Sequence, residues 1–206
     1  MRIGIFTDTY TPDINGVVSS VVTLQRGLEA AGHDVYIVTG QKNSLHAHRE
    51  GNVIRMPGVE LKKLYGYTLS TPYHFEVKKE VEDLHLDVIH VQQEFSVGIF
   101  GRILGHNLHI PVVYTYHTLY EDYTHYVNFF DLNSVEKISK KAVHSLSRYL
   151  CNSVSGIIAP SEKTREKLLG YGVTRPIYVI PTGLDLDSFA HERVSGELCA
   201  QVRERH

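Results

Sequence analysis

The chain of 206 residues carries 21 lysine and arginine residues against 23 aspartate and glutamate residues, a formal net charge of −2. Hydrophobic residues make up 42% and charged residues 21% of the chain, values typical of a soluble globular domain, which excludes intrinsic disorder as its main state. The near-neutral balance argues against a general nucleic-acid-binding protein, and no run of about 18 apolar residues is present to span a membrane.

The N-terminus and the cysteines predict a cytoplasmic chain. Met1–Phe6 is too short an apolar run for a signal peptide, because the sequence becomes polar at Thr7. Cys151 and Cys199 lie far apart and form no CxxC motif, which is typical of reduced thiols.

Short apolar runs alternate with longer helical patterns along the chain. We expect strands at 3–6, 35–39, 53–56, 88–91, 112–116, 157–159 and 177–180, and helices at 16–31, 75–84, 97–108, 134–151 and 161–169, with a loop at 41–52. Three glycines (Gly98, Gly101 and Gly105) fall on one side of the helix 97–108, which indicates close packing on a sheet. Because the strands are continuous apolar runs separated by helices, we predict a Rossmann-like, doubly wound α/β domain with about seven parallel strands.

The turn after the first strand is a candidate phosphate site. Asn15-Gly16 stands at the predicted start of a helix, where free N–H groups and the helix dipole favour an anion. A glycine at this position lets a diphosphate approach the backbone. The turn lacks the GxGxxG pattern of dinucleotide-binding proteins, and the alternative is that Asn15-Gly16 only shapes the turn.

The segment 114–126 holds five tyrosines, two histidines and two acidic residues. The predicted strand delivers His117 to the carboxyl edge of the sheet, and so many polar tips suit a hydroxyl-rich ligand, since each of them needs a partner. A structural polar loop is one alternative. A zinc site is another, but His117 and His125 are eight residues apart and do not form an HExxH motif.

Two further groups of residues follow. In the segment 90–96, Glu94 and Ser96 either contact a ligand or cap the following helix. Basic residues gather at Lys62-Lys63 and on one face of the helix 134–151, where the face consists of Lys137, Lys140, Lys141, His144 and Arg148. Such a face is either ordinary solvated surface or a contact with anionic lipid.

Five segments together resemble the N-terminal half of a family 4 retaining glycosyltransferase with the GT-B fold. They are DTYTPDINGVVSSV (8–21), HVQQEFSVGIFGR (90–102), YTYHTLYEDYTHY (114–126), APSEKTREKLLGYGV (159–173) and VIPTGLDLDSF (179–189). The third segment is most similar to the diacylglycerol glucosyltransferases of Gram-positive bacteria.

The resemblance implies transfer of glucose from a sugar nucleotide, UDP-glucose, to membrane diacylglycerol by a peripheral protein on the inner face of the cell membrane. It implies that His117 orients the donor sugar and that Gly16, Val17 and Glu94 bind the donor. The residues implied for the acceptor are Asp13, Asn15, Tyr120, Asp122, Tyr123 and Tyr126. The basic residues themselves, and not the resemblance, predict the membrane contact, which is expected at Lys62, Lys63, Lys137, Lys140, Lys141 and Arg148.

The resemblance also implies a division into domains. Residues 1–189 are expected to form the acceptor-side domain, and residues 190–206 a linker or the start of a C-terminal donor-binding domain, so the 206 residues alone are expected to be inactive. No metal or other cofactor is expected, because positive residues and a helix terminus neutralise the leaving diphosphate. Two alternatives remain: the same fold with phosphatidylinositol or a soluble sugar as acceptor, and a non-catalytic sugar- or phosphate-binding module.

Overall fold

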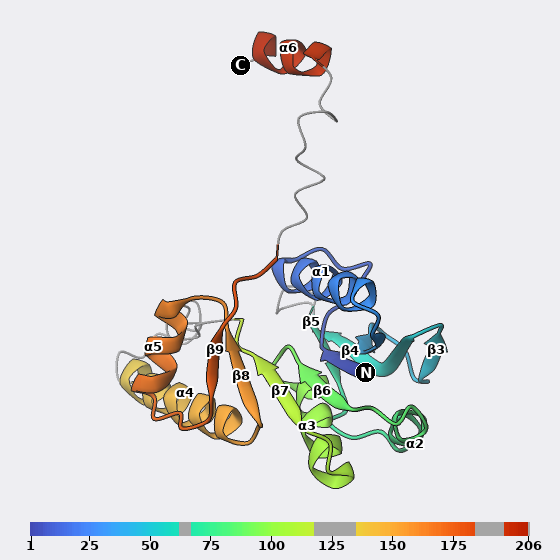
Figure 1. Ribbon diagram of the computed structural model, residues 1–206, viewed down its shortest axis with the longest axis vertical. Helices are drawn as coiled ribbons and strands as arrows, with labels where there is room; N and C mark the ends of the chain where they lie inside the picture. The colour runs from blue at the N-terminus through green and yellow to red at the C-terminus, as the bar shows by residue number, and fades with distance from the viewer. Residues whose placement is uncertain (62–66, 118–134, 184–195, 206) are drawn as a thin grey trace.

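The computed structural model describes residues 1–61, 67–117, 135–183 and 196–205 (Figure 1). The strands are β1 (Arg2–Thr7), β2 (Asp34–Gln41), β3 (His48–Glu50), β4 (Val53–Leu61), β5 (Tyr67–Ser70), β6 (Val88–Val91), β7 (Val112–Thr115), β8 (Gly156–Ala159) and β9 (Ile177–Val179). The helices are α1 (Gly16–Ala30), α2 (Phe75–Asp83), α3 (Ser96–Leu108), α4 (Val135–Asn152), α5 (Glu162–Gly170) and α6 (Gly196–Arg205).

The strands form one nine-stranded sheet in the order β3-β4-β2-β1-β6-β7-β8-β9, with β5 paired to β4. The strands β1, β2, β4, β6, β7, β8 and β9 run parallel to one another, which confirms the predicted parallel core. The chain moves outward from β1 to β2 and β4 and then returns to β6 on the other side of β1. The strand order therefore reverses between β1 and β6, and ligands of open α/β sheets bind at such a reversal.

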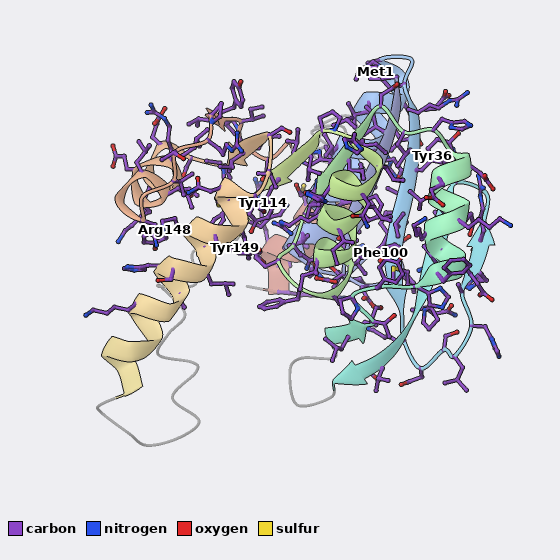
Figure 2. All side chains as sticks on the ribbon, turned by 90° about the horizontal axis from the view of Figure 1, so that it is seen from below. Met1, Tyr36, Phe100, Tyr114, Arg148 and Tyr149 are labelled. Atoms are coloured by element: carbon purple, nitrogen blue, oxygen red, sulfur yellow. The ribbon has the colours of Figure 1, made fainter. Side chains whose placement is uncertain are left out.

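Helices cover both faces of the sheet, as predicted. On one face, Ile3 and Ile5 of β1 pack with Val21 of α1. On the other face, Phe6 and Phe100 belong to the larger apolar core, to which α2, α3, α4 and α5 all contribute. Figure 1 shows α1 on one side of the strands and α2 and α3 on the other, and Figure 2 shows Phe100 on α3.

The three glycines of α3 bring this helix against the sheet. A Cβ atom at Gly101 would lie 2.9 Å from the ring of Phe6, and one at Gly105 would lie 2.2 Å from a methyl group of Val112. The close packing predicted from the glycine spacing is therefore confirmed.

The prediction of a loop at 41–52 was wrong, because this segment forms one edge of the sheet. The expected loop at 41–52 contains β3, β4 extends beyond Met56 to Leu61, and β5 pairs with it antiparallel. All three residues of β3 are exposed, so this edge strand carries no apolar run that could identify it. The helix α6 lies in the range expected to be a linker or the start of another domain.

Candidate functional site

Two loops are tied together at the carboxyl ends of β1 and β6. The carboxylate of Asp8 accepts hydrogen bonds from the hydroxyl of Ser96 (2.7 Å) and the N–H of Val97 (2.8 Å). In return, the side-chain oxygen of Gln93 accepts from the N–H groups of Asp8 (2.6 Å) and Thr9 (3.3 Å). This reciprocal pairing holds the loop after β1 at the point where the strand order reverses.

The same contacts correct the expected capping of α3. The residue that precedes α3 is Phe95, which makes no side-chain capping bond, and Asp8 from the distant β1 loop takes the capping role. Ser96 donates to Asp8, and Glu94 accepts a hydrogen bond from the hydroxyl of Tyr114.

The side chain of Glu94 is buried in the interior of the domain. It belongs to a network in which the guanidinium of Arg102 lies 4.5 Å from the centre of the Tyr114 ring. Burial, followed by the nearby Glu94 carboxylate, raises the pKa of Tyr114 well above its ordinary value. Glu94 therefore has an internal partner, and its contact with a donor stays a prediction.

The N-terminus of α1 has the features expected of an anion site. The side chain of Asn15 caps the helix by accepting from the N–H of Val18 (2.9 Å), and the first turn contains no acidic residue. In the first backbone hydrogen bond of the helix, the N–H of Ser19 donates to the carbonyl oxygen of Asn15. The N–H groups of Gly16 and Val17 therefore lie ahead of the helical hydrogen bonds. A Cβ atom at Gly16 would meet nothing within 4 Å, and its φ is not positive, so neither the turn nor local packing requires this glycine.

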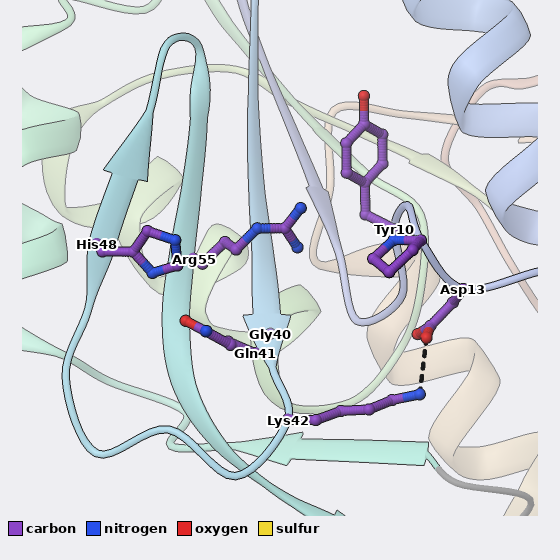
Figure 3. A pocket seen from close by; sticks show the side chains of 8 residues that line it. Tyr10, Asp13, Gly40, Gln41, Lys42, His48 and Arg55 are labelled. Atoms are coloured by element: carbon purple, nitrogen blue, oxygen red, sulfur yellow. Dashed lines mark hydrogen bonds and ion pairs between the residues drawn. The ribbon is translucent and has the colours of Figure 1, made fainter.

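Asp13 lines a cavity of about 330 Å³ beside this turn (Figure 3). Its carboxylate pairs with the ammonium of Lys42 at 2.7 Å. Tyr10 and Arg55 also line the cavity, and Arg55 donates to the backbone oxygen of Thr11 (2.9 Å).

Two pairs of polar side chains connect β6 to β7 like the rungs of a ladder. Nε2 of His90 lies 2.7 Å from the hydroxyl of Thr115, and two residues further along both strands Nε2 of His117 lies 2.8 Å from the amide oxygen of Gln92. Burial lowers the pKa of His117 to about 4, and burial together with charge repulsion from His117 lowers the pKa of His90 to about 4. Both rings are therefore neutral at pH 7. We call these four residues the polar ladder.

The polar ladder lies on the sheet face that α1 covers, since His90 is in register with Ile5. Next to it is a cavity of about 310 Å³. His90, Gln92 and Thr115 line this cavity together with hydroxyl groups of α1 and of Thr182.

Some expected site residues lie outside the described part of the chain. They are Lys62, Lys63, Tyr120, Asp122, Tyr123 and Tyr126, and the side chains of Lys137 and Lys140 are also not described.

The outer side of α4 carries both charged and apolar groups. Lys141 and Arg148 are exposed, and so are two apolar residues of the same helix, Leu146 and Tyr149. Figure 2 labels Arg148 and Tyr149 on α4. The ring of His144 instead stacks on the ring of Tyr171, with 4.2 Å between the ring centres. His144 is therefore not part of an exposed basic face.

Within the described ranges, no group of three or more His, Cys, Asp or Glu residues is arranged to hold a metal ion. In the same ranges, no helix has the length and apolar character that crossing a membrane requires.

The sheet order and the site at its reversal define a Rossmann-like domain of the GT-B class. Residues 14–188 match Glycosyltransferase Family 4, and the chain belongs to this family. It is similar over its whole length to two proteins named alpha-monoglucosyldiacylglycerol synthase, from Streptococcus pneumoniae (36% identity) and Acholeplasma laidlawii (35%). The chain spans about half the length of these curated relatives, 45% and 52%. A solved structure of sucrose-phosphate synthase from Thermosynechococcus elongatus shares the fold, with a TM-score of 0.50, 15% identity, and coverage of 98% of this chain and 99% of that one.

Three residues of this edge were not expected from the sequence: the buried Asp8 and Gln92 and the half-buried Gln93. The sequence does contain a signal that could have identified Gln92. His90 and Gln92 are two residues apart at the end of β6, and Thr115 and His117 are two residues apart at the end of β7. Their partners lie 25 residues away in the chain, and only the pairing of β6 with β7 brings them together.

Proposed function

We propose that the protein carrying this chain is a retaining glycosyltransferase that moves glucose from UDP-glucose to membrane diacylglycerol. The observation that carries the proposal is the match over the whole chain to two relatives named for the synthesis of alpha-monoglucosyldiacylglycerol. In this proposal residues 1–189 form the acceptor-side domain, and the groups that bind the nucleotide lie in a C-terminal domain of the full-length protein.

The start of α1 supports the donor assignment. The backbone N–H groups of Gly16 and Val17 lie at a helix N-terminus whose first turn has no acidic residue, which favours the diphosphate of the donor. The absence of a side chain at Gly16 leaves room for that diphosphate. No bound metal is needed in this scheme, because the helix terminus and positive residues stabilise the leaving group.

His117 orients the donor sugar in this proposal. The ring is neutral, so it serves as a hydrogen-bonding group and not as a charge. The configuration of the sugar is then retained because the acceptor hydroxyl attacks from the same face that the diphosphate leaves. A phosphate oxygen of the donor takes the proton of that hydroxyl.

The acceptor side is formed by Asp13 and Asn15 with the segment 120–126. The ion pair of Asp13 with Lys42 fixes the carboxylate at the rim of the Figure 3 cavity. The capping bond of Asn15 occupies its amide oxygen, and its amide nitrogen donates to the hydroxyl of Thr9 at 3.5 Å, so one of its two amide N–H groups is left for the acceptor. The protein is peripheral to the membrane, with contact made by Lys62, Lys63 and the basic residues of α4.

The test is a transfer assay with the full-length protein, radiolabelled UDP-glucose and diacylglycerol in mixed micelles. We expect a labelled glucosyl-lipid. Labelling of phosphatidylinositol or a soluble sugar in its place would overturn the acceptor, and binding without any transfer would make the protein a non-catalytic module.

In the same assay, His117→Ala should lower kcat by about 10²-fold, the scale for loss of one transition-state contact. The matched control is His106→Ala, because His106 is an exposed histidine of α3. Activity of His117→Ala within threefold of wild type would show that His117 is structural.

A further inference from the structure

Gln92 is the first residue beyond β6 and carries one of the most deeply placed polar side chains at the carboxyl edge of the sheet. It is 1% exposed, and its amide oxygen lies 2.8 Å from Nε2 of His117. Its amide nitrogen has no hydrogen-bond partner within the part of the chain that the structure describes.

The backbone holds Gln92 rigidly. Its N–H donates to the backbone oxygen of Phe6 at 2.9 Å, which continues the pairing of β6 with β1. The next residue, Gln93, is tied to the loop after β1 through the N–H of Asp8. A side chain supported in this way can fix the orientation of the group to which it bonds.

The chemistry of the contact determines where the imidazole proton lies. An amide oxygen only accepts hydrogen bonds, so Nε2 of His117 must donate, and in a neutral ring Nδ1 then keeps its lone pair. The other titratable group facing the pair in the described residues is His90, which lies one rung deeper and is bonded to Thr115.

We infer that Gln92 is a positioning residue, which holds His117 as the Nε2–H tautomer and presents Nδ1 as an acceptor for a substrate hydroxyl. The inference rests on the role given to His117 in the proposed function. The unpaired amide N–H₂ of Gln92 supplies a second feature of the same subsite, since a buried amide donor is costly unless an oxygen from a ligand satisfies it.

The first test is nuclear magnetic resonance of this chain, with ¹⁵N and ¹H detection of the His117 ring. We expect the Nε2–H tautomer in the wild-type protein and a ring proton protected from exchange with water. In Gln92→Met, which keeps the length of the side chain but removes the acceptor, that proton should exchange at least about tenfold faster.

A second variant keeps the test decisive if Gln92→Met does not fold. Gln92→Glu retains an acceptor and adds a negative charge beside His117, so the titration midpoint of His117 should rise by about 1–3 pH units. The matched control is Thr115→Val, which removes the partner of His90 one rung away and should leave the tautomer and ring-proton exchange of His117 unchanged. An Nδ1–H tautomer in the wild type, or an unchanged midpoint in Gln92→Glu, would overturn the inference.

Kinetics of the full-length enzyme separate this inference from the proposed function. Gln92→Met should lower kcat by about tenfold or more without raising KM for UDP-glucose, the scale for loss of a group that orients a functional histidine. The acidic limb of the rate profile should move to higher pH in Gln92→Glu. If the resonance results hold while both rates stay at wild-type values, the positioning contact stands and the catalytic role of His117 is overturned.

Discussion

At the scale of single residues, the carboxyl edge of the sheet is held by side chains whose partners are far away in the chain. Asp8 is 1% exposed and bonds to two groups at the start of α3. The helix thus receives its cap from a residue 88 positions earlier than Ser96. Such a contact couples the loop that leads to Gly16 with the helix that follows β6.

Replacement of Asp8 should therefore destabilise the whole domain. Asp8→Ala leaves the N–H of Val97 and the hydroxyl of Ser96 buried without an acceptor, which should cost about 2–3 kcal/mol of unfolding free energy. Asp8→Asn keeps one acceptor oxygen and should cost less than half of that amount. Urea denaturation measures both, and equal costs for the two variants would contradict a capping role.

At the scale of elements, glycines play opposite roles in α1 and α3. A Cβ atom at Gly98 of α3 would lie 1.9 Å from the backbone oxygen of Gln93, whereas one at Gly27 of α1 would meet nothing within 4 Å. Both positions are helical, so the difference comes from what lies beside each helix.

The two glycines give a matched pair of variants. Gly98→Ala should destabilise the domain by about 1–3 kcal/mol, because backbone and not a flexible side chain must move. Gly27→Ala should stabilise it by about 0.5–1 kcal/mol, since alanine favours the helix and finds open space. Chemical denaturation of both proteins checks the signs, and a neutral Gly98→Ala would show that α3 does not need its close approach to the sheet.

At the scale of the whole molecule, two neutral histidines, the buried His90 and the half-buried His117, make stability depend on pH. The pKa of His90 and of His117 is about 4 in the folded state, below the value near 6.5 of an unfolded chain. Between these values the unfolded chain binds protons that the folded chain does not. The contribution is therefore complete above about pH 6.5 and is lost as the pH falls toward 4, by up to about 1.4 kcal/mol per pH unit for each ring.

Urea denaturation between pH 7 and pH 5 tests this dependence above the range in which most carboxylates titrate. His90→Asn should flatten the loss of stability on acidification, and the exposed His106→Asn should not. An identical slope in wild type and His90→Asn would show that His90 is not the group that titrates.

The proposed membrane contact is also a property of the whole surface. Each lysine or arginine near an anionic bilayer contributes about 1 kcal/mol, so we expect the four cations Lys137, Lys140, Lys141 and Arg148 together to give reversible binding that weakens as salt rises. The exposed Tyr149, which follows Arg148 in the chain, should add apolar contact.

Sedimentation of this chain with phosphatidylglycerol liposomes measures the effect. Changing the four α4 cations to Gln should reduce pelleting strongly. The matched control changes four exposed cations outside α4 to Gln (Arg26, Lys79, Arg165 and Arg175), which gives the same net charge and should reduce pelleting much less. Equal pelleting of the two variants would overturn the assignment of the membrane-binding surface to α4.

The parallel core could be predicted from the sequence because its signals are local. Apolar runs such as 88–91 and the helical spacing of 16–30 depend on neighbours within one or two turns, and burial on both faces of the sheet demands those runs. The glycine spacing in α3 likewise predicted its close packing. The exposed edge strand β3 escaped prediction because an edge that faces water needs no apolar pattern.

The candidate site likewise combines features that the local sequence predicts with contacts that it does not. The sequence by itself determined that Gly16 begins a helix and that His117 follows a strand, because both facts depend on local periodicity. Only the tertiary structure decided that Asp8 caps α3, that Glu94 accepts from Tyr114, and that His117 bonds to Gln92. These partners are between 20 and 89 residues apart, and which of them meet is set by the order and register of the strands, which no local stretch of sequence encodes.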